Sequence, residues 1–129
     1  QHHPLLRRMI YSTDVQSAHH DFGGSDGAEL LVVSGARLKS VNLVPPVNKN
    51  SFVEFYDLDD DTGTLDVTKR MLSLVSGAYA STMSGGIWIR IPGNGIRFST
   101  GIVARATTSD IGGDETQFIT IVYQGAIPD

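Results

Sequence analysis

One stretch of the chain, residues 85–106 (GGIWIRIPGNGIRFSTGIVARA), constrains the fold more than any other. In its segment IWIRI the three isoleucines fall on one face of an extended chain, and Trp88 and Arg90 fall on the other. Alternation with a period of two is typical of a β-strand that is buried on one face only. The segment therefore predicts a half-buried strand.

The same stretch continues through a turn into two more apolar runs. Pro-Gly-Asn-Gly at 92–95 combines a fixed φ with residues that tolerate positive φ, which is turn chemistry. The runs that follow occupy residues 96–98 and 102–106. Three short strands joined by tight turns are predicted, and nothing in them indicates a reaction.

The rest of the chain repeats this pattern of short apolar runs between turn residues. Residues 65–75 also fit a short helix, but their Thr and Val content favours extended structure. The other expected strands cover residues 28–33, 36–44, 52–58 and 117–123. Seven or eight short strands with no convincing helical crossover predict an all-β fold, an antiparallel β-sandwich of the jelly-roll or immunoglobulin-like kind.

Composition narrows the class of protein. A length of 129 residues suits one domain, and 40% hydrophobic with 19% charged residues is a globular profile. The net charge of -4 without a basic stripe argues against a nucleic-acid partner. No apolar run reaches the roughly 20 residues that span a bilayer, so no membrane partner is expected. The chain has no cysteine, which excludes disulfides and thiolate chemistry.

Residues 1–27 differ from the rest and predict an extended N-terminal arm with a glycine hinge, followed by a single sandwich domain over residues 28–129. The tip of the arm combines apolar side chains with a basic pair. Its candidate partner-binding residues are Leu5, Leu6, Arg7, Arg8, Met9, Ile10 and Tyr11. Either the arm reaches onto a neighbouring subunit, or it packs back on its own domain as an edge strand or short helix.

An acidic loop offers candidate metal ligands. Asp57, Asp59 and Asp61 alternate as at the start of a calcium loop. The match to an EF-hand then fails, because Thr62 stands where the tight-turn glycine belongs and Thr68 where a bidentate glutamate belongs. A looser calcium site formed by the three aspartates is one interpretation. A solvated turn, in which aspartates cap their own backbone, is the other.

Catalytic groups are scarce. The four histidines form two adjacent pairs, at 2–3 and 19–20, which both fall in the arm rather than in a body strand. Without cysteine or a body histidine, the serines have no base to activate them. Glycoside hydrolysis by a pair of carboxylates remains an open alternative. Its candidate residues are Glu29, Glu54 and Glu115, although their spacing does not indicate such a pair. We expect a protein that is not an enzyme and uses no cofactor.

Trp88 and Arg90 are the candidate contact residues of the body. Trp and Arg are enriched in subunit interfaces, so a partner-binding face is one interpretation. The alternative is a second core layer, with the arginine extending to its edge. Stacking of the indole ring on a sugar is a third.

Four segments, taken in order, resemble small β-sandwich virion proteins of tailed bacteriophages. These are LLVVSGARLKSVNLV (30–44), FVEFYDLDD (52–60), IPGNGIRFSTGIVARAT (91–107) and FITIVYQG (118–125). The strand turn G-I-R-F-x-x-G-I, followed by a terminal T-I-x-Y strand, carries the resemblance. It covers roughly residues 28–125, and the arm lies outside it.

The resemblance implies a binding scaffold, such as a capsid decoration (cement) protein, a head fibre or a tail component. For a decoration protein, the implied partner is the major capsid protein, the implied oligomer is a homotrimer, and the implied location is the capsid surface of a virion assembled in the host cytoplasm. A carbohydrate-binding module, or a tail or fibre component for host attachment, is the alternative function.

Overall fold

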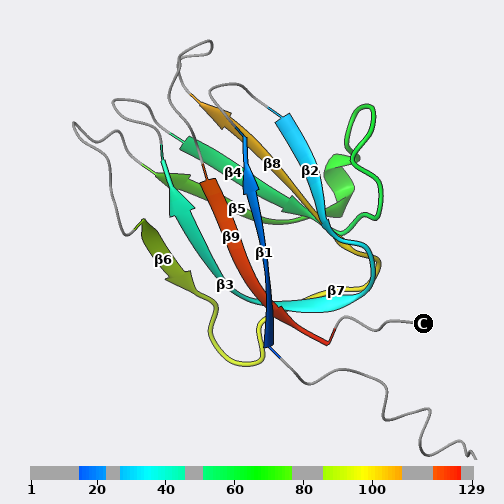
Figure 1. The fold of residues 1–129 in the computed structure, drawn as a ribbon. Helices are drawn as coiled ribbons and strands as arrows, with labels where there is room; N and C mark the ends of the chain where they lie inside the picture. Colours follow the sequence, from blue (N-terminus) through cyan, green and yellow to red (C-terminus); the bar gives the residue numbers. More distant parts are fainter. Residues whose placement is uncertain (1–14, 23–26, 46–50, 77–85, 109–117, 126–129) are drawn as a thin grey trace, which may run out of the picture.

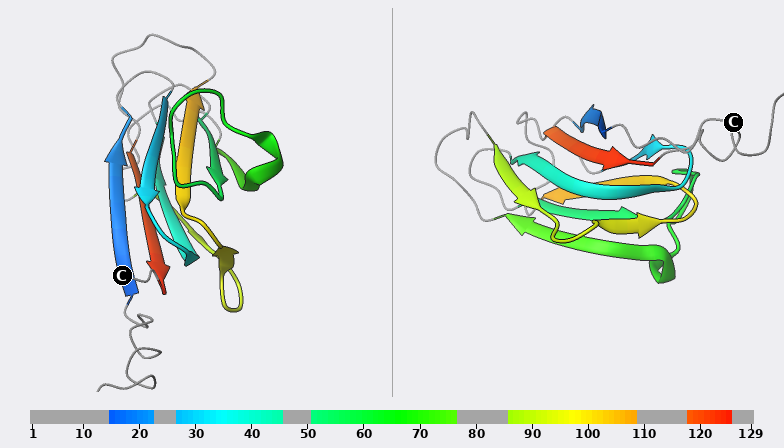
Figure 2. Two further views of the ribbon diagram at one scale, coloured as in Figure 1. Left: turned by 90° about the vertical axis from the view of Figure 1, so that its right-hand side faces the viewer. Right: turned by 90° about the horizontal axis from the view of Figure 1, so that it is seen from below.

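The computed structural model describes residues 15–22, 27–45, 51–76, 86–108 and 118–125. Within them the chain forms nine β-strands and one short 3-10 helix, arranged as two antiparallel sheets that pack face to face (Figures 1 and 2). The elements are β1 (Val15–Asp21), β2 (Gly27–Val32), β3 (Ala36–Val44), β4 (Ser51–Tyr56), η1 (Val67–Lys69), β5 (Arg70–Ser76), β6 (Ile87–Arg90), β7 (Ile96–Phe98), β8 (Ile102–Thr108) and β9 (Phe118–Gln124). The expected all-β sandwich is confirmed.

The strand order identifies the kind of sandwich. The first sheet has the order β1-β9-β3-β6, with β7 also paired to β3, and the second sheet has the order β2-β8-β4-β5. Successive strand pairs nest inside one another along the chain, as in an antiparallel ribbon rolled into two sheets. From the outermost to the innermost, these pairs are β1–β9, β2–β8, β3–β6/β7 and β4–β5. This is the jelly-roll arrangement. An immunoglobulin-like sandwich would keep its first two strands in one sheet, whereas β1 and β2 lie in different sheets.

The core lies between the two sheets and follows from the alternation of apolar residues. β3 and β4 supply fully buried side chains such as Leu38, Leu43 and Phe55, and β9 adds Ile119 and Ile121. Burial of each such side chain stabilises the fold by about 1.5–3 kcal/mol relative to exposure. The same alternation places the intervening residues on the outer faces, where any binding chemistry must lie.

The stretch at 85–106 is divided between the two sheets. β6 and β7 pair with successive parts of the long strand β3, so together they form one edge of the first sheet. β8 instead lies inside the second sheet, between β2 and β4. The three strands are confirmed, although the third extends to Thr108 rather than ending at residue 106.

Residues 15–21 of the expected arm form an edge strand. β1 pairs with β9 along its whole length, from Val15 opposite Gln124 to Asp21 opposite Phe118. Its residues alternate between exposed and half-buried, and Ala18 packs against the core. Residues 15–21 were expected to belong to an extended arm, whereas in the structure they form a strand that packs on its own domain. Residues 1–14 and 23–26, the rest of the expected arm and hinge, lie outside the described residues.

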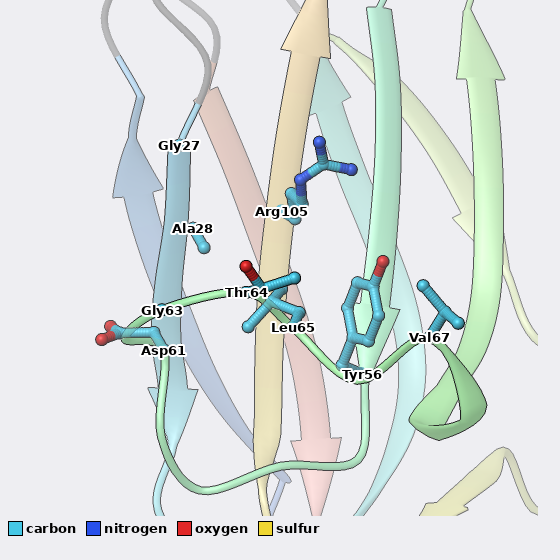
Figure 3. Close-up of a pocket in the computed structure, with 9 residues that line it drawn as sticks. All are labelled: Gly27, Ala28, Tyr56, Asp61, Gly63, Thr64, Leu65, Val67 and Arg105. Atoms are coloured by element: carbon cyan, nitrogen blue, oxygen red, sulfur yellow. The ribbon is translucent and has the colours of Figure 1, made fainter.

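The expected strand over residues 65–75 begins later than its composition indicates. Val67–Lys69 form the 3-10 helix, because the Asp66 carboxylate caps it by accepting the Thr68 backbone N–H at 3.0 Å and the Thr68 hydroxyl at 2.7 Å. Strand β5 then runs from Arg70. The chain between β4 and β5 is thus free to form a long loop across the outer face of the second sheet (Figure 3).

Candidate functional site

The outer face of the second sheet carries a four-residue polar cluster on three neighbouring strands. Glu54 on β4 lies directly opposite Arg105 on β8, and Tyr56 lies opposite Arg70 on β5. Arg105 Nη1 and Tyr56 Oη each donate to Glu54 Oε1 at 2.9 Å, and Arg70 Nη1 donates to Glu54 Oε2 at 2.9 Å. One carboxylate therefore ties β5, β4 and β8 together through side chains.

The cluster shifts the pKa values of both titratable groups at its centre. Partial burial by itself raises the pKa of Glu54, but hydrogen bonds from the tyrosine and both arginines outweigh it, so the pKa lies below the ordinary value of 4.5. Burial and the hydrogen bond to Glu54 raise the pKa of Tyr56 above its ordinary value of 10.0. The carboxylate thus stays ionised and the phenol stays protonated at neutral pH.

The acidic loop after β4 is fastened to the strands around it. Asp57 Oδ1 accepts the backbone N–H of Thr100 at 2.7 Å and that of Gly101 at 3.4 Å. Asp61 Oδ2 accepts the backbone N–H of Leu30 on β2 at 2.8 Å. These hydrogen bonds join segments more than thirty residues apart, so the loop is held at its first residue, Asp57, and again at Asp61.

Of the two interpretations of Asp57, Asp59 and Asp61, the geometry favours the capped turn over the calcium site. In the described part of the chain, no three His, Cys, Asp or Glu side chains gather closely enough to hold a metal ion. Asp57 and Asp61 instead direct their carboxylates at backbone N–H groups of different segments. Asp60 accepts the backbone N–H and hydroxyl of Thr62, as expected for an aspartate that caps its own turn.

The loop and the sheet border a cavity of about 540 Å³ that is open to solvent on one side (Figure 3). Ala28 on β2, Arg105 on β8 and Tyr56 on β4 form its floor, and Thr64 and Leu65 of the loop form its wall. Figure 3 shows the Arg105 guanidinium between β8 and β4, on the side of the cavity away from β2. The sequence offered one signal for this site, namely charged residues alternating with buried ones in strands β4 and β8.

Trp88 and Arg90 lie on the outer face of β6 in the first sheet. Trp88 is 62% exposed and Arg90 is also exposed, whereas Ile89 between them packs against the core. The interpretation of these two residues as a second core layer is therefore wrong. With Ser40 and Ile89 they line a second, smaller hollow of about 420 Å³. Among the described strands only β3 pairs with β6, so the other edge of β6 has no described strand beside it.

The histidines at 19–20 lie in a strand of the sheet, contrary to expectation. His19 contacts the Thr120 hydroxyl at 3.0 Å and stacks on Phe118, with 5.7 Å between ring centroids. His20 packs edge-on against Phe22 and lies 3.9 Å from Glu29. As expected for neighbours on an extended chain, one histidine is exposed and the other half-buried. The histidines at 2–3 lie outside the described residues.

Glu29 and Glu54 do not form a carboxylate pair. They lie opposite Ala104 and Arg105, which are consecutive residues of β8 and so point to opposite faces of the sheet. The third candidate, Glu115, lies outside the described residues. The two placed glutamates therefore do not share a cleft in which glycoside hydrolysis could take place.

The candidate contact residues of the arm, Leu5 to Tyr11, lie outside the part of the chain that the structure describes. Among the described residues, no helix has the length and apolarity needed to cross a bilayer. Comparison of the sequence with models of known protein families and with curated proteins finds no match.

Proposed function

We propose that this chain is a non-enzymatic structural protein of a tailed-phage virion, a capsid decoration protein that binds the major capsid lattice and stabilises the head. The observation that carries the proposal is the exposed Trp88 beside Arg90 on an edge strand of a jelly roll. Jelly rolls recur in viral capsid proteins, and the phage-like segments at 30–44, 52–60, 91–107 and 118–125 coincide with strands of this one.

The physical chemistry of the Trp88 face suits docking to another protein. An indole ring exposed to 62% carries apolar surface that is stabilised when a partner removes it from water. Trp and Arg are the side chains most often responsible for binding energy in interfaces. The hollow beside them accepts a protruding side chain of the partner.

In this proposal the protein acts as a homotrimer on the capsid surface, with residues 5–11 as a second contact. A trimer matches the threefold positions of a capsid lattice, because each protomer then presents the same face to an equivalent capsid subunit. Sedimentation of the purified protein measures this part of the proposal. A mass of one chain at micromolar concentration would contradict the trimer.

Co-sedimentation with empty capsids of the phage that encodes the chain tests the binding face. We expect Trp88→Ala to weaken capsid binding at least about tenfold, as a central aromatic contact does. The matched control is Val75→Ala, which removes an apolar side chain of similar exposure, 69%, from the other sheet. The control is expected to bind within about twofold of the unchanged protein.

Two outcomes would contradict the proposal. If the Trp88→Ala protein bound capsids as tightly as the unchanged protein, the contact with the capsid would not lie on β6. Absence of capsid binding, together with glycan-array binding that depends on Trp88, would instead establish the carbohydrate-binding alternative, because an exposed indole ring is also the surface on which sugars stack.

A further inference from the structure

The cavity on the outer face of the second sheet lies on the opposite side of the sandwich from Trp88, and capsid binding through Trp88 does not use it. We propose that this cavity binds a small polyhydroxylated carboxylate, a sugar acid, whose carboxylate pairs with Arg105. The inference is independent of the proposed virion function, since the two sites lie on different sheets.

The size of the cavity is that of a small-molecule site. Its volume of about 540 Å³ falls within the roughly 300–1,000 Å³ typical of small-molecule pockets. The floor consists of the paired strands β2, β8 and β4, and the loop is held by the hydrogen bonds of Asp57 and Asp61. Binding therefore requires little ordering of the protein, which favours affinity for a small ligand.

The charges of the polar cluster favour an anion at the β8 side. Glu54 is the shared acceptor of Arg70 and Arg105, so one carboxylate faces two guanidinium groups. Arg105 commits one N–H to Glu54, whereas a guanidinium has five N–H donors. Its side chain is 46% exposed and lines the cavity, which leaves donors available for a second carboxylate.

The β2 side of the cavity offers a hydroxyl group, that of Thr64. Asp61 lies beside it, but its carboxylate points past the outer edge of β2, where Oδ2 accepts the Leu30 N–H (Figure 3). Figure 3 places Thr64 between Asp61 and Arg105. A ligand that fits this order has a carboxylate at one end, for Arg105, and hydroxyl groups along the rest, one of them for Thr64. Sugar acids have this arrangement.

The apolar part of the lining supports a ring rather than a bare ion. Ala28 and Leu65 present hydrocarbon to the cavity between the polar groups. The C–H faces of a pyranose ring pack against such side chains while its hydroxyls form hydrogen bonds. A simple inorganic anion would leave this surface unused.

NMR titration of the ¹⁵N-labelled full chain with sodium D-glucuronate tests the inference. We expect the amide signals of Thr64, Leu65 and Arg105 to shift with saturation in the millimolar range. Methyl β-D-glucoside, which lacks the carboxylate, and alanine, which has an ammonium group in place of hydroxyls, are expected to bind at least tenfold more weakly. Titration with oligogalacturonate, an acidic oligosaccharide, shows whether the natural ligand is a free sugar acid or part of a polymer. Tighter binding of the oligosaccharide than of glucuronate would indicate a polymer.

Two variants test the assigned groups separately. Arg105→Gln removes the anion partner, and Ala28→Leu fills the floor without touching the Glu54 hydrogen bonds. Each is expected to weaken glucuronate binding at least tenfold, and the ¹⁵N spectrum of each variant shows whether the fold is kept. The matched control, Arg97→Gln on β7, removes an exposed arginine outside the cavity and should leave binding unchanged.

The inference is overturned if glucuronate leaves the cavity amides unshifted, or if Ala28→Leu keeps its fold and binds glucuronate as well as the unchanged protein does. Tighter binding of alanine than of glucuronate would also overturn it, because the site would then select an ammonium group. None of these results bears on capsid binding, which is measured through Trp88.

Discussion

At the scale of single residues, Glu54 shows how a charge is kept in the middle of a sheet. Its side chain is only 19% exposed, yet hydrogen bonds from Tyr56, Arg70 and Arg105 occupy both carboxylate oxygens. Hydrogen bonds to a charged group are stronger than neutral ones, whereas an unpaired charge at this position would be costly. Because the arginines are nearly half exposed, solvent reduces the strength of each ion pair.

This arrangement predicts a stability that depends on pH. The folded-state pKa of Glu54 lies below its ordinary value of 4.5, so its stabilisation is present above that value and is lost as the pH falls through the folded-state pKa. We expect Glu54→Gln to lower the free energy of unfolding by about 1–2 kcal/mol at pH 7. Urea unfolding from pH 7 to pH 3 measures the difference, which should shrink towards the acid end.

The matched control is Glu29→Gln, because Glu29 is 41% exposed and lies 3.9 Å from its one described ionic neighbour, His20. Its substitution should change the free energy of unfolding by less than about 0.5 kcal/mol at pH 7. A Glu54→Gln deficit that stays constant down to pH 3 would contradict the charge-based explanation.

At the scale of elements, the turn between β6 and β7 depends on two glycines with different surroundings. Gly93 and Gly95 both have positive φ, of 66° and 80°. A Cβ at Gly93 would meet nothing within 4 Å, whereas a Cβ at Gly95 would lie 2.4 Å from the Leu38 carbonyl oxygen. Of these two glycines, only Gly95 therefore lies against the backbone of β3.

A pair of alanine substitutions separates backbone strain from this close approach. Both pay the cost of a side chain at positive φ, about 1 kcal/mol. Gly95→Ala must also displace the backbone of β3, and we expect it to lower the free energy of unfolding by about 1–3 kcal/mol more than Gly93→Ala does. Urea unfolding of the two proteins measures this, and equal losses would contradict the predicted contact with Leu38.

At the scale of the whole molecule, β1 closes the first sheet and also covers part of the core. It pairs with β9 at seven positions, and Phe22, immediately after it, is buried among the core residues. Removal of residues 1–22 would uncover the edge of β9 and expose core side chains to water. The sandwich therefore begins at Val15 in the described structure, not at residue 28.

Two truncations test this assignment and the role of the preceding residues. We expect removal of residues 1–14 to change the melting temperature by less than about 3 °C, and removal of residues 1–22 to lower it by about 10 °C or more, because a buried aromatic and a strand are lost. Scanning calorimetry measures both. Equal melting temperatures would contradict the structural role of β1.

The shorter truncation also tests the proposed second contact with the capsid. If residues 5–11 bind the capsid lattice, the protein without residues 1–14 keeps its fold and binds capsids more weakly than the full chain. Capsid binding of undiminished strength by this folded protein would contradict the contact and leave Trp88 as the proposed docking residue.

The sequence by itself determined the local structure, because the alternation of apolar and polar residues that marks a strand depends only on residues that are neighbours in the chain. The alternation of IWIRI placed Ile89 and Trp88 on opposite faces of one strand, and turn residues separated β6, β7 and β8, whereas the exposure of Trp88 came from the structure. The same patterns predicted an all-β sandwich but left jelly-roll and immunoglobulin-like orders open. Strand order depends on pairings between distant segments, which local periodicity does not encode.

Only the tertiary structure decided which residues meet. β1 has little apolar content of its own, and its place at the sheet edge comes from hydrogen bonds to β9, about a hundred residues away. Asp57 and Asp61 resemble calcium ligands in sequence, but the fold brings them to the backbone N–H groups of Thr100 and Leu30 instead. The stretch at 85–106 thus fixed the fold's class, whereas long-range pairing built the Glu54 cluster and the cavity beside it.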